Sequence, residues 1–280
     1  MSGLGHDVIL DSYRRACLDE LEALKPGNVH VHADGHRMRV DDFVRSAEVS
    51  GPGLAARGTR VGERVLAGVR ATIEGIGTNT NLGIILLCAP LAMAAERDGD
   101  LFAQLASVLA DLDREDAVAA FEAIRIASPA GLGRVADHDV HTTPAVDLRT
   151  AMQAAAGHDR IARAYVTDYR DVLEVGLPAL DEARRQARDP RWSTTAAYLA
   201  FLASIPDTHI QRKFGTREAE SVQCQAAEIR SAISLTEGSC EVLLQFDRNL
   251  KARGINPGTS ADFTVATLFA DRLIRARECL

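Results

Sequence analysis

Aromatic side chains are scarce in this chain of 280 residues, where Phe, Trp and Tyr together make up 5%. Lysine is scarcer still and occurs only at Lys25, Lys213 and Lys251. A core with so few rings must be filled mostly by Leu, Ile, Val and Ala, which favours packed helices. The net charge of −7 excludes a bulk attraction for nucleic acid or an anionic membrane, so we expect neither partner. Any phosphate must therefore be held by a local site.

Long apolar runs are also missing. A membrane span needs about 20 apolar residues, and the longest candidate, NLGIILLCAPLAMAA at residues 81–95, is shorter and carries Pro90. It predicts a central helix near residues 81–96 that is buried on all sides in a soluble core. The N-terminus has no basic region followed by an apolar run, so no signal peptide is expected. The five cysteines form no C-x-x-C pair and indicate free thiols in a reducing compartment, so we predict a cytoplasmic protein.

No stretch shows the alternating, β-branched pattern of a strand bounded by turns. Apolar residues instead recur at steps of three or four, as at Ile9, Tyr13, Cys17 and Leu21. Another helical pattern covers residues 159–187. We predict an all-α fold, a single multi-helix bundle domain over residues 1–280. If the chain has two lobes, the Gly- and Pro-rich loop at 128–144 is the expected boundary.

Four short polar corners interrupt the helical patterns. They are KPGNVHVH at 25–32, GTNTNLG at 77–83, DTHIQRKFG at 207–215 and NPGTSADF at 256–263. Turn and capping chemistry explains any one of them alone, because Asn and Gly accept left-handed angles and Ser, Thr and Asp cap helices. Helix N-termini also offer N–H groups and a positive dipole end to anions. Four similar corners in one chain favour a shared site.

The corners differ in the ligands that they offer. GTNTNLG leads into an apolar helix and has the amides of Asn79 and Asn81 to face a phosphate or a sugar, but the spacing of a P-loop is absent. DTHIQRKFG places Arg212 and Lys213 in the same corner as Asp207. That arrangement either holds a polyphosphate, with a forked contact from Arg and a point charge from Lys, or is a solvated loop.

Histidine pairs and one carboxylate raise the question of a metal. His30 and His32 are spaced to chelate zinc, yet no pattern supplies a third and a fourth ligand. The cluster that contains His138 and His141 is more typical of a polar loop. Asp262, in NPGTSADF, either interacts with the dipole of the following helix or binds Mg²⁺ as a hard oxygen donor.

Taken in order, the stretches KPGNVH, DDFVRSA (41–47), GTNTNLG and NPGTSADF resemble the triphosphoribosyl-dephospho-CoA synthase family, and the similarity runs from about Tyr13 to Leu273. The resemblance implies an all-α enzyme in which ATP is attacked at the ribose C1′ rather than at phosphorus. Adenine leaves, and the triphosphoribosyl group passes to the 2′-hydroxyl of 3′-dephospho-CoA. Mg²⁺ is implied as the companion of ATP.

The implied reaction gives the corner residues roles. Breaking an N-glycosidic bond builds positive charge on the sugar, which a carboxylate stabilises while it accepts the proton of the attacking hydroxyl. We therefore predict Asp42 and Glu63 as catalytic residues, and Asp207 and Asp262 as metal ligands. Lys25→Ala is expected to weaken ATP binding and to leave the helical circular-dichroism signal near normal. The predicted ATP and triphosphate ligands are Lys25, Gly27, Asn28, His30, Ser46, Thr78, Asn79, Thr80, Asn81, Arg212, Lys213, Asn256, Gly258, Thr259 and Ser260.

One departure from the family pattern concerns the acceptor. Members associated with citrate or malonate lyases carry His-Lys where this chain has Asn81 and Leu82. The form found here looks more like the branch in methane-forming and methylotrophic microbes. An alternative is therefore (phospho)ribosyl transfer to a pterin-ribitol acceptor in tetrahydromethanopterin biosynthesis. An alternative of another class is a non-catalytic helical nucleotide-binding protein. A homodimer is expected from the base rate for soluble enzymes.

Overall fold

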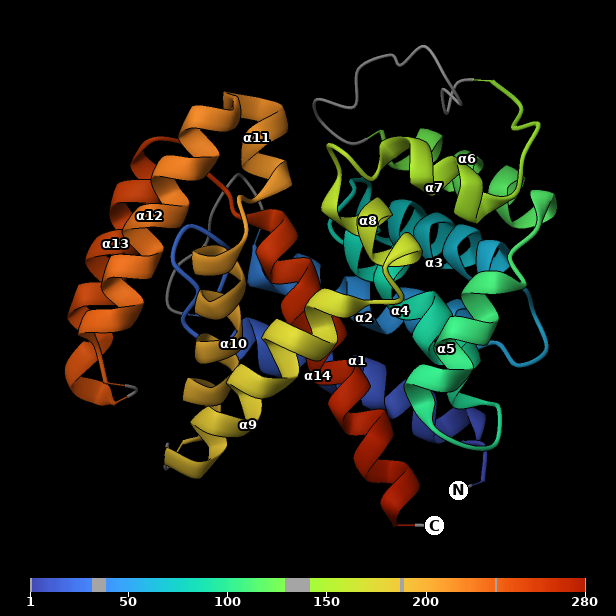
Figure 1. The fold of residues 1–280 in the computed structure, drawn as a ribbon, viewed down its shortest axis with the longest axis horizontal. Coiled ribbons are helices and arrows are strands. Elements are labelled where there is room, and N and C mark those ends of the chain that lie inside the picture. The colour runs from blue at the N-terminus through green and yellow to red at the C-terminus, as the bar shows by residue number, and fades with distance from the viewer. Residues whose placement is uncertain (1, 32–38, 129–141, 187–188, 235, 280) are drawn as a thin grey trace. The chain divides into compact units, whose positions relative to one another are not determined.

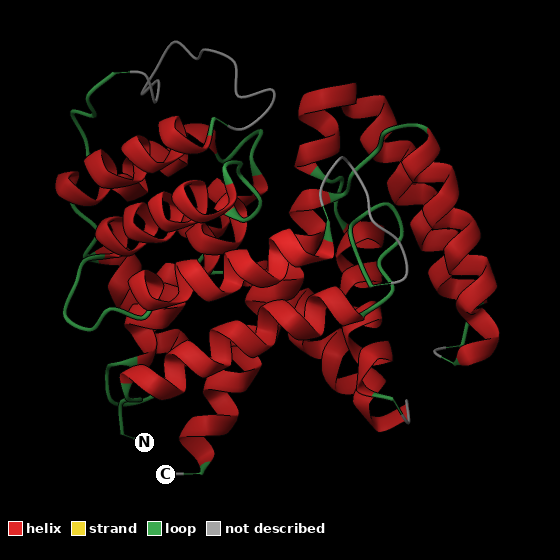
Figure 2. Ribbon diagram, turned by 180° about the vertical axis from the view of Figure 1, so that it is seen from behind, coloured by secondary structure: helices red, strands yellow, loops and turns green. Residues whose placement is uncertain are grey.

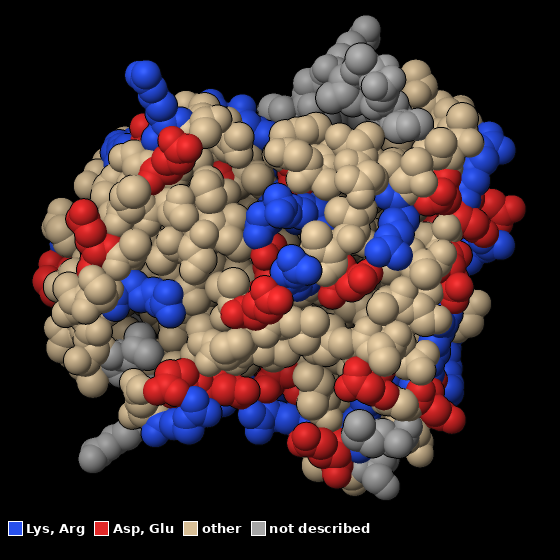
Figure 3. Space-filling view, in the orientation of Figure 1, with Lys and Arg blue, Asp and Glu red and all other residues tan. Residues whose placement is uncertain are grey.

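The computed structural model describes the chain except residues 1, 32–38, 129–141, 187–188, 235 and 280 (Figure 1). The described residues form fourteen α-helices and no strand, which confirms the predicted all-α class (Figure 2). None of the helices within the described ranges is long and apolar enough to cross a membrane. The face drawn in Figure 3 carries basic and acidic side chains intermingled.

The chain forms two compact units. The first unit comprises Met1–Ala16, Phe43–Tyr169 and Phe269–Leu280, and the second comprises Cys17–Asp42 and Arg170–Leu268. The predicted lobe boundary at 128–144 lies mostly outside the described residues. That the whole chain behaves as a single domain stays a prediction.

The first unit is built on α4 (Leu82–Ala95), the helix predicted to be buried. Apart from Gly83 and Met93, every residue of α4 is buried, so that prediction is confirmed. The other helices of this unit are α3 (Val61–Ile76), α5 (Leu101–Ala110), α6 (Arg114–Ala127), α7 (Leu148–Ala155) and α8 (Arg160–Val166), with the start of α1 (His6–Glu22), most of α2 (Val40–Leu54) and the end of α14 (Gly258–Glu278).

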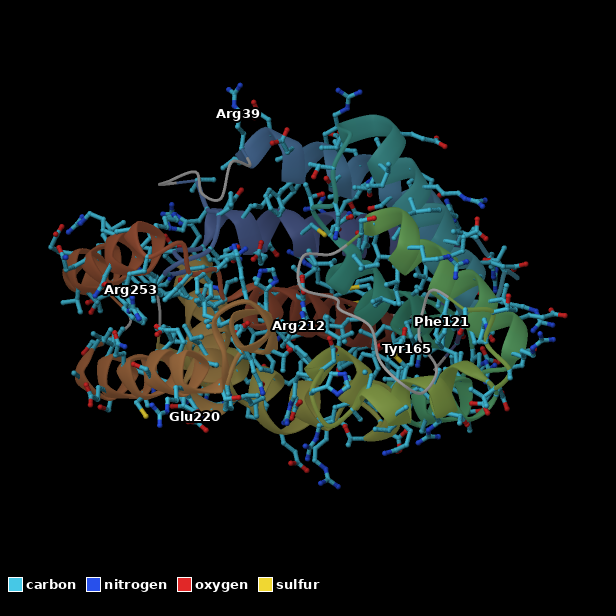
Figure 4. The ribbon with its side chains drawn as sticks, turned by 90° about the horizontal axis from the view of Figure 1, so that it is seen from above. Arg39, Phe121, Tyr165, Arg212, Glu220 and Arg253 are labelled. Atoms are coloured by element: carbon cyan, nitrogen blue, oxygen red, sulfur yellow. The ribbon has the colours of Figure 1, made fainter. Side chains whose placement is uncertain are left out.

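Polar contacts from its neighbours complete the backbone of α4. Pro90 has no N–H for the carbonyl of Leu86, four residues earlier, and the buried hydroxyl of Tyr165 donates to that oxygen at 2.7 Å. Tyr165 lies inside the first unit (Figure 4). Near the end of α4, the buried guanidinium of Arg277 donates to the carbonyl of Ala94 at 2.9 Å. The proline is therefore accommodated without an unpaired carbonyl.

The second unit surrounds a cluster of aliphatic and aromatic side chains. Its helices are α9 (Leu177–Gln186), α10 (Pro190–Ser204), α11 (Thr208–Phe214), α12 (Thr216–Ala232) and α13 (Cys240–Ala252), with the end of α1 and most of α14. A π-helical turn at Val172–Gly176 precedes α9, and a 3₁₀ turn at Glu237–Ser239 precedes α13. The core of the unit includes Tyr198, Leu199, Leu202, Ile210, Val222, Leu243, Phe246 and Leu250.

One sequence prediction was wrong, and one alternative that the sequence left open is excluded. The pattern over 159–187 is not one helix, because Asp168 and Tyr169 take left-handed angles (φ 50° and 59°) between α8 and the π-helical turn. The stretch DTHIQRKFG is not a loop, because residues Thr208–Phe214 form α11 with Asp207 as its N-cap. Both differences bear on how the polar residues are positioned.

Candidate functional site

The first corner, KPGN, lies in the second unit and is organised by a buried lysine. Lys25 is fully buried and its ammonium donates to the carboxylate of Glu20, to Asn28 Oδ1 at 3.2 Å and to the Val29 carbonyl at 2.8 Å. Burial lowers the pKa of Lys25 and raises the pKa of Glu20, and the ion pair opposes both shifts. These three acceptors use the three ammonium hydrogens, so a phosphate must displace one of them to bind Lys25.

Gly27 is required by the conformation of this corner. Its φ is +84°, and a Cβ there would lie 2.8 Å from Pro257 Cδ and 2.9 Å from Leu250 Cδ1. Its N–H donates to Asp247 Oδ1 at 2.8 Å. A residue with a side chain would be strained and would also collide with α13 and with the fourth corner.

Asp247, on α13, is a residue that the sequence analysis missed. Its side chain is 3% exposed, and besides the Gly27 N–H it has Lys251 Nζ at 3.0 Å and His30 Nε2 at 3.4 Å from Oδ1. Burial alone would raise the pKa of Asp247, but the contacts with His30, Gly27 and Lys251 hold it below its ordinary value. Burial lowers the pKa of His30. At neutral pH the pair is therefore a carboxylate beside a neutral imidazole.

The first and fourth corners meet in the second unit. Asn28 Nδ2 donates to Asn256 Oδ1 at 2.8 Å, across 228 positions of sequence. Asn28 is buried, while Asn256 is half-buried. The structure thus brings together two of the stretches that carry the family resemblance.

Asp207 joins the third corner to the fourth. Its Oδ1 accepts from the N–H groups of His209 at 2.9 Å and Ile210 at 3.1 Å, and its Oδ2 accepts from Ser260 N at 2.7 Å and Ser260 Oγ at 2.8 Å. Thr259 Oγ1 also accepts from the His209 N–H at 3.1 Å. Asp207 is 2% exposed and caps α11 and α14 together. Four hydrogen bonds on its two oxygens argue against the metal-ligand role predicted for it.

The remaining candidates of the second unit are more accessible. Asp262 is half-buried in the first turn of α14, and its charge contributes to the electrostatics of Lys25. Gly258 begins α14. Arg212 is half-buried on α11 (Figure 4), and Lys213 is exposed, with Nζ 5.4 Å from the centre of the Phe214 ring. These groups have the exposure that ligand contact requires.

The second corner, GTNTNLG, belongs to the first unit and sits on a chain of hydroxyl groups. Thr80 Oγ1 lies 2.5 Å from Ser46 Oγ, Ser50 Oγ donates to the Ser46 carbonyl at 2.6 Å, and Tyr13 Oη lies 2.9 Å from Ser50 Oγ. Asn81 is 4% exposed, and its Nδ2 donates to Ser50 Oγ at 3.3 Å. Asn81 Oδ1 has no hydrogen-bond partner among the atoms described. This corner is a polar network under the start of α4.

The other residues of this corner lie nearer the surface. Asn79 Oδ1 accepts from the Leu82 N–H at 3.1 Å, so Asn79 serves the free N–H groups at the start of α4. Thr78 is exposed. Leu82, the first residue of α4, is 8% exposed.

The two predicted catalytic carboxylates both serve helix starts. Asp42 Oδ2 accepts from the backbone N–H of Arg39 at 2.8 Å. The side chain of Arg39 points away from the ribbon (Figure 4). Glu63 is exposed, and its Oε2 accepts from the Arg60 N–H at 2.9 Å at the start of α3. Asp42 belongs to the second unit and Glu63 to the first. Their catalytic role stays a prediction.

The described residues contain no group of three or more His, Cys, Asp or Glu side chains that could hold a metal ion. The predicted partner of His30, His32, lies outside the described residues, as do His138 and His141. A zinc site at either histidine pair therefore stays untested.

These observations define an all-helical protein in which three polar corners of one unit are joined by direct hydrogen bonds. Comparison with known proteins gives the family: the chain belongs to the CitG family of ATP:dephospho-CoA triphosphoribosyl transferases, whose sequence profile matches residues 6–279.

Curated relatives match over a shorter region. The 2-(5″-triphosphoribosyl)-3′-dephosphocoenzyme-A synthase of Klebsiella pneumoniae is 27% identical over 108 residues, which are 36% of this chain and 37% of the relative. A candidate synthase of the same name from Stutzerimonas stutzeri is 32% identical over 111 residues, 38% of this chain and 37% of the relative. The chain thus spans little more than a third of the length of these relatives.

A solved structure supports the fold over most of the chain. It is a candidate triphosphoribosyl-dephospho-CoA synthase from Archaeoglobus fulgidus, with a TM-score of 0.63 and 24% identity. The match covers 80% of this chain and 95% of that chain. At this identity the similarity shows the fold alone.

Proposed function

We propose that the protein transfers the triphosphoribosyl group of ATP to the 2′-hydroxyl of 3′-dephospho-CoA and releases adenine. The observation that carries the proposal is the joining of the KPGN, DTH and NPGTSADF stretches into one hydrogen-bonded cluster, in a chain that belongs to this family from residue 6 to residue 279. The predicted homodimer and the predicted cytoplasmic location remain predictions.

The triphosphate must be held while the base departs, because it is not the leaving group. The α14 helix, 21 residues long, begins at Gly258, and its dipole favours an anion near that end, although the N–H groups of Gly258, Ser260 and Ala261 are already bonded within the protein. Asn256, whose side chain is half-buried, lies two residues before the helix. Arg212, on α11, adds a guanidinium suited to a forked phosphate contact. We therefore place the triphosphate at the start of α14.

Mg²⁺ fits this arrangement as a companion of the nucleotide. Mg²⁺ commonly takes one or two protein carboxylates and completes its coordination with substrate phosphates and water. Asp262, in the first turn of α14, is the carboxylate with the exposure for that role, since both oxygens of Asp207 are occupied by helix capping. Bound there, the ion would neutralise phosphate charge.

The transfer itself makes one bond and breaks one. The oxygen of the acceptor hydroxyl bonds to C1′ of the ribose, and the bond from C1′ to N9 of adenine breaks with its electron pair going to adenine. The hydroxyl proton must pass to a base, and a carboxylate near C1′ also stabilises the positive charge that develops on the sugar. Asp42 and Glu63 remain the predicted candidates for this work.

The reaction can be tested directly with Mg-ATP and 3′-dephospho-CoA. We expect free adenine by liquid chromatography and an equal amount of acceptor that has gained one triphosphoribosyl group by mass spectrometry. A reaction without acceptor is the control. Adenine released only with a pterin-ribitol acceptor would contradict the proposed acceptor. Tight ATP binding with no adenine from any acceptor would contradict the transferase function.

A further inference from the structure

Two lysines lie beside the junction of the KPGN and NPGTSADF corners, and their exposure differs. The side chain of Lys25 is fully buried and its ammonium has three protein acceptors. The side chain of Lys251, in the last turn of α13, is 16% exposed. The corner that contains Asn256 and Gly258 begins five residues further along the chain. Lys251 is therefore a cation beside this junction that a ligand can reach, whereas the ammonium of Lys25 is buried.

Lys251 is held by a carboxylate that is itself fixed. Asp247 Oδ1 lies 3.0 Å from Lys251 Nζ, and Asp247 also accepts the Gly27 N–H at 2.8 Å. Burial is the main cause of the lowered pKa of Lys25 and of His30, and the charge of Lys251 adds to the shift in both. The charge of Lys251 therefore reaches the buried Lys25 and His30 of the junction.

We propose that Lys251 binds a phosphate of the nucleotide and that Asp247 is the positioning residue that orients it. The inference rests on the proposed function and names the cation that meets the triphosphate there. Asp247 anchors the KPGN corner through Gly27 and orients Lys251 through the same oxygen, so one buried carboxylate sets the position of both. A merely structural ion pair would stabilise the end of α13 and be indifferent to the number of phosphates on a ligand.

Binding of AMP, ADP and ATP distinguishes these roles. Isothermal titration calorimetry with magnesium and no acceptor would compare the wild type with Lys251→Met, Lys251→Arg and Arg248→Met. Arg248 is an exposed cation of the same helix that pairs with Glu241, so Arg248→Met removes the same charge elsewhere on α13. Thermal unfolding of each variant would report its stability.

We expect the wild type to bind ATP more tightly than AMP. The Lys251→Met variant is expected to bind ATP about ten-fold more weakly than the wild type, because it loses a charge-assisted hydrogen bond. Its affinity for AMP should change little. Lys251→Arg should keep most of the ATP preference, and Arg248→Met all of it. Asp247→Asn should lose the preference as Lys251→Met does, and the double variant should lose no more than either single one.

The inference is overturned if Lys251→Met keeps the full preference for ATP, or if it loses AMP and ATP binding equally. It is also overturned if Asp247→Asn retains the preference. A wild type that binds no nucleotide, or that binds AMP as tightly as ATP, would instead refute the proposed function, so the two failures are separable.

Discussion

The Lys25–Glu20 ion pair gives a sharp prediction about stability. The side chain of Lys25 is 0% exposed and that of Glu20 is 5% exposed, so water screens neither charge. Lys25→Met keeps most of the side-chain volume but leaves the carboxylate of Glu20 buried without its partner. Breaking a buried pair in this way costs about 3–5 kcal/mol of unfolding free energy. From the sequence, we expect substitution of Lys25 to weaken ATP binding and to change the fold little. The structure predicts the reverse, a large loss of stability and a smaller effect on ATP binding.

Chemical denaturation followed by circular dichroism would measure this loss. The double variant Glu20→Gln with Lys25→Met is expected to recover much of it, because no charge is then left buried. Lys213→Met, which removes an exposed lysine of α11, is the matched control and should unfold like the wild type. Lys25→Met that unfolds at the wild-type denaturant concentration but binds ATP weakly would refute the reasoning and return Lys25 to the role of a phosphate ligand.

The pH dependence of the same variant provides a second check. Burial raises the pKa of Glu20 in the folded state, and removal of Lys25 removes the group that opposes this shift. A carboxyl group whose pKa is raised by folding contributes stability that is present at low pH and is lost as the pH rises through the folded-state pKa. The loss of unfolding free energy in Lys25→Met, relative to the wild type, is therefore expected to be smallest in acid and to grow toward neutral pH.

Three other substitutions test the geometry around the corners and α4, each by the unfolding free energy from denaturation. Gly27→Ala should cost about 1–3 kcal/mol or more, because φ is +84° and a Cβ would lie 2.8 Å from Pro257; an unchanged free energy would show that the corner relaxes freely. Tyr165→Phe should cost about 1–3 kcal/mol, since it leaves the carbonyl of Leu86 without its donor, and a neutral effect would mean that water replaces the hydroxyl. Asp207→Ala should cost about 2 kcal/mol or more because two helices lose a cap, whereas a loss no larger than that of one exposed cap would contradict the double role.

Hydrophobic pattern predicted the fold class because it reports burial directly. The run at residues 81–95 is apolar around the whole helix, and α4 is indeed buried on all its faces. The break at Asp168 and Tyr169 was not predictable in this way, because no Gly or Pro marks it. The side chain of Tyr169 is instead fixed by a long-range contact, a 2.9 Å hydrogen bond from its hydroxyl to the carbonyl of Leu87.

The candidate site was predictable only in part. Short polar motifs identified three stretches that the structure joins, but the motif pattern could not show which polar atoms are consumed in joining them. Asp207 and Lys25 carry the charges that suit a metal or a phosphate, yet both are buried and bonded to the protein. Asp247 was missed because it lies within a helical pattern; its spacing of four residues from Lys251 was the one signal available.

A crystal structure of the protein with Mg-ATP would show directly where the triphosphate binds. We expect the triphosphate at the start of α14, near Asn256 and Asp262, with Lys251 Nζ about 3 Å from a phosphate oxygen. A nucleotide bound away from that helix start, with Lys251 still paired only to protein groups, would contradict this expectation.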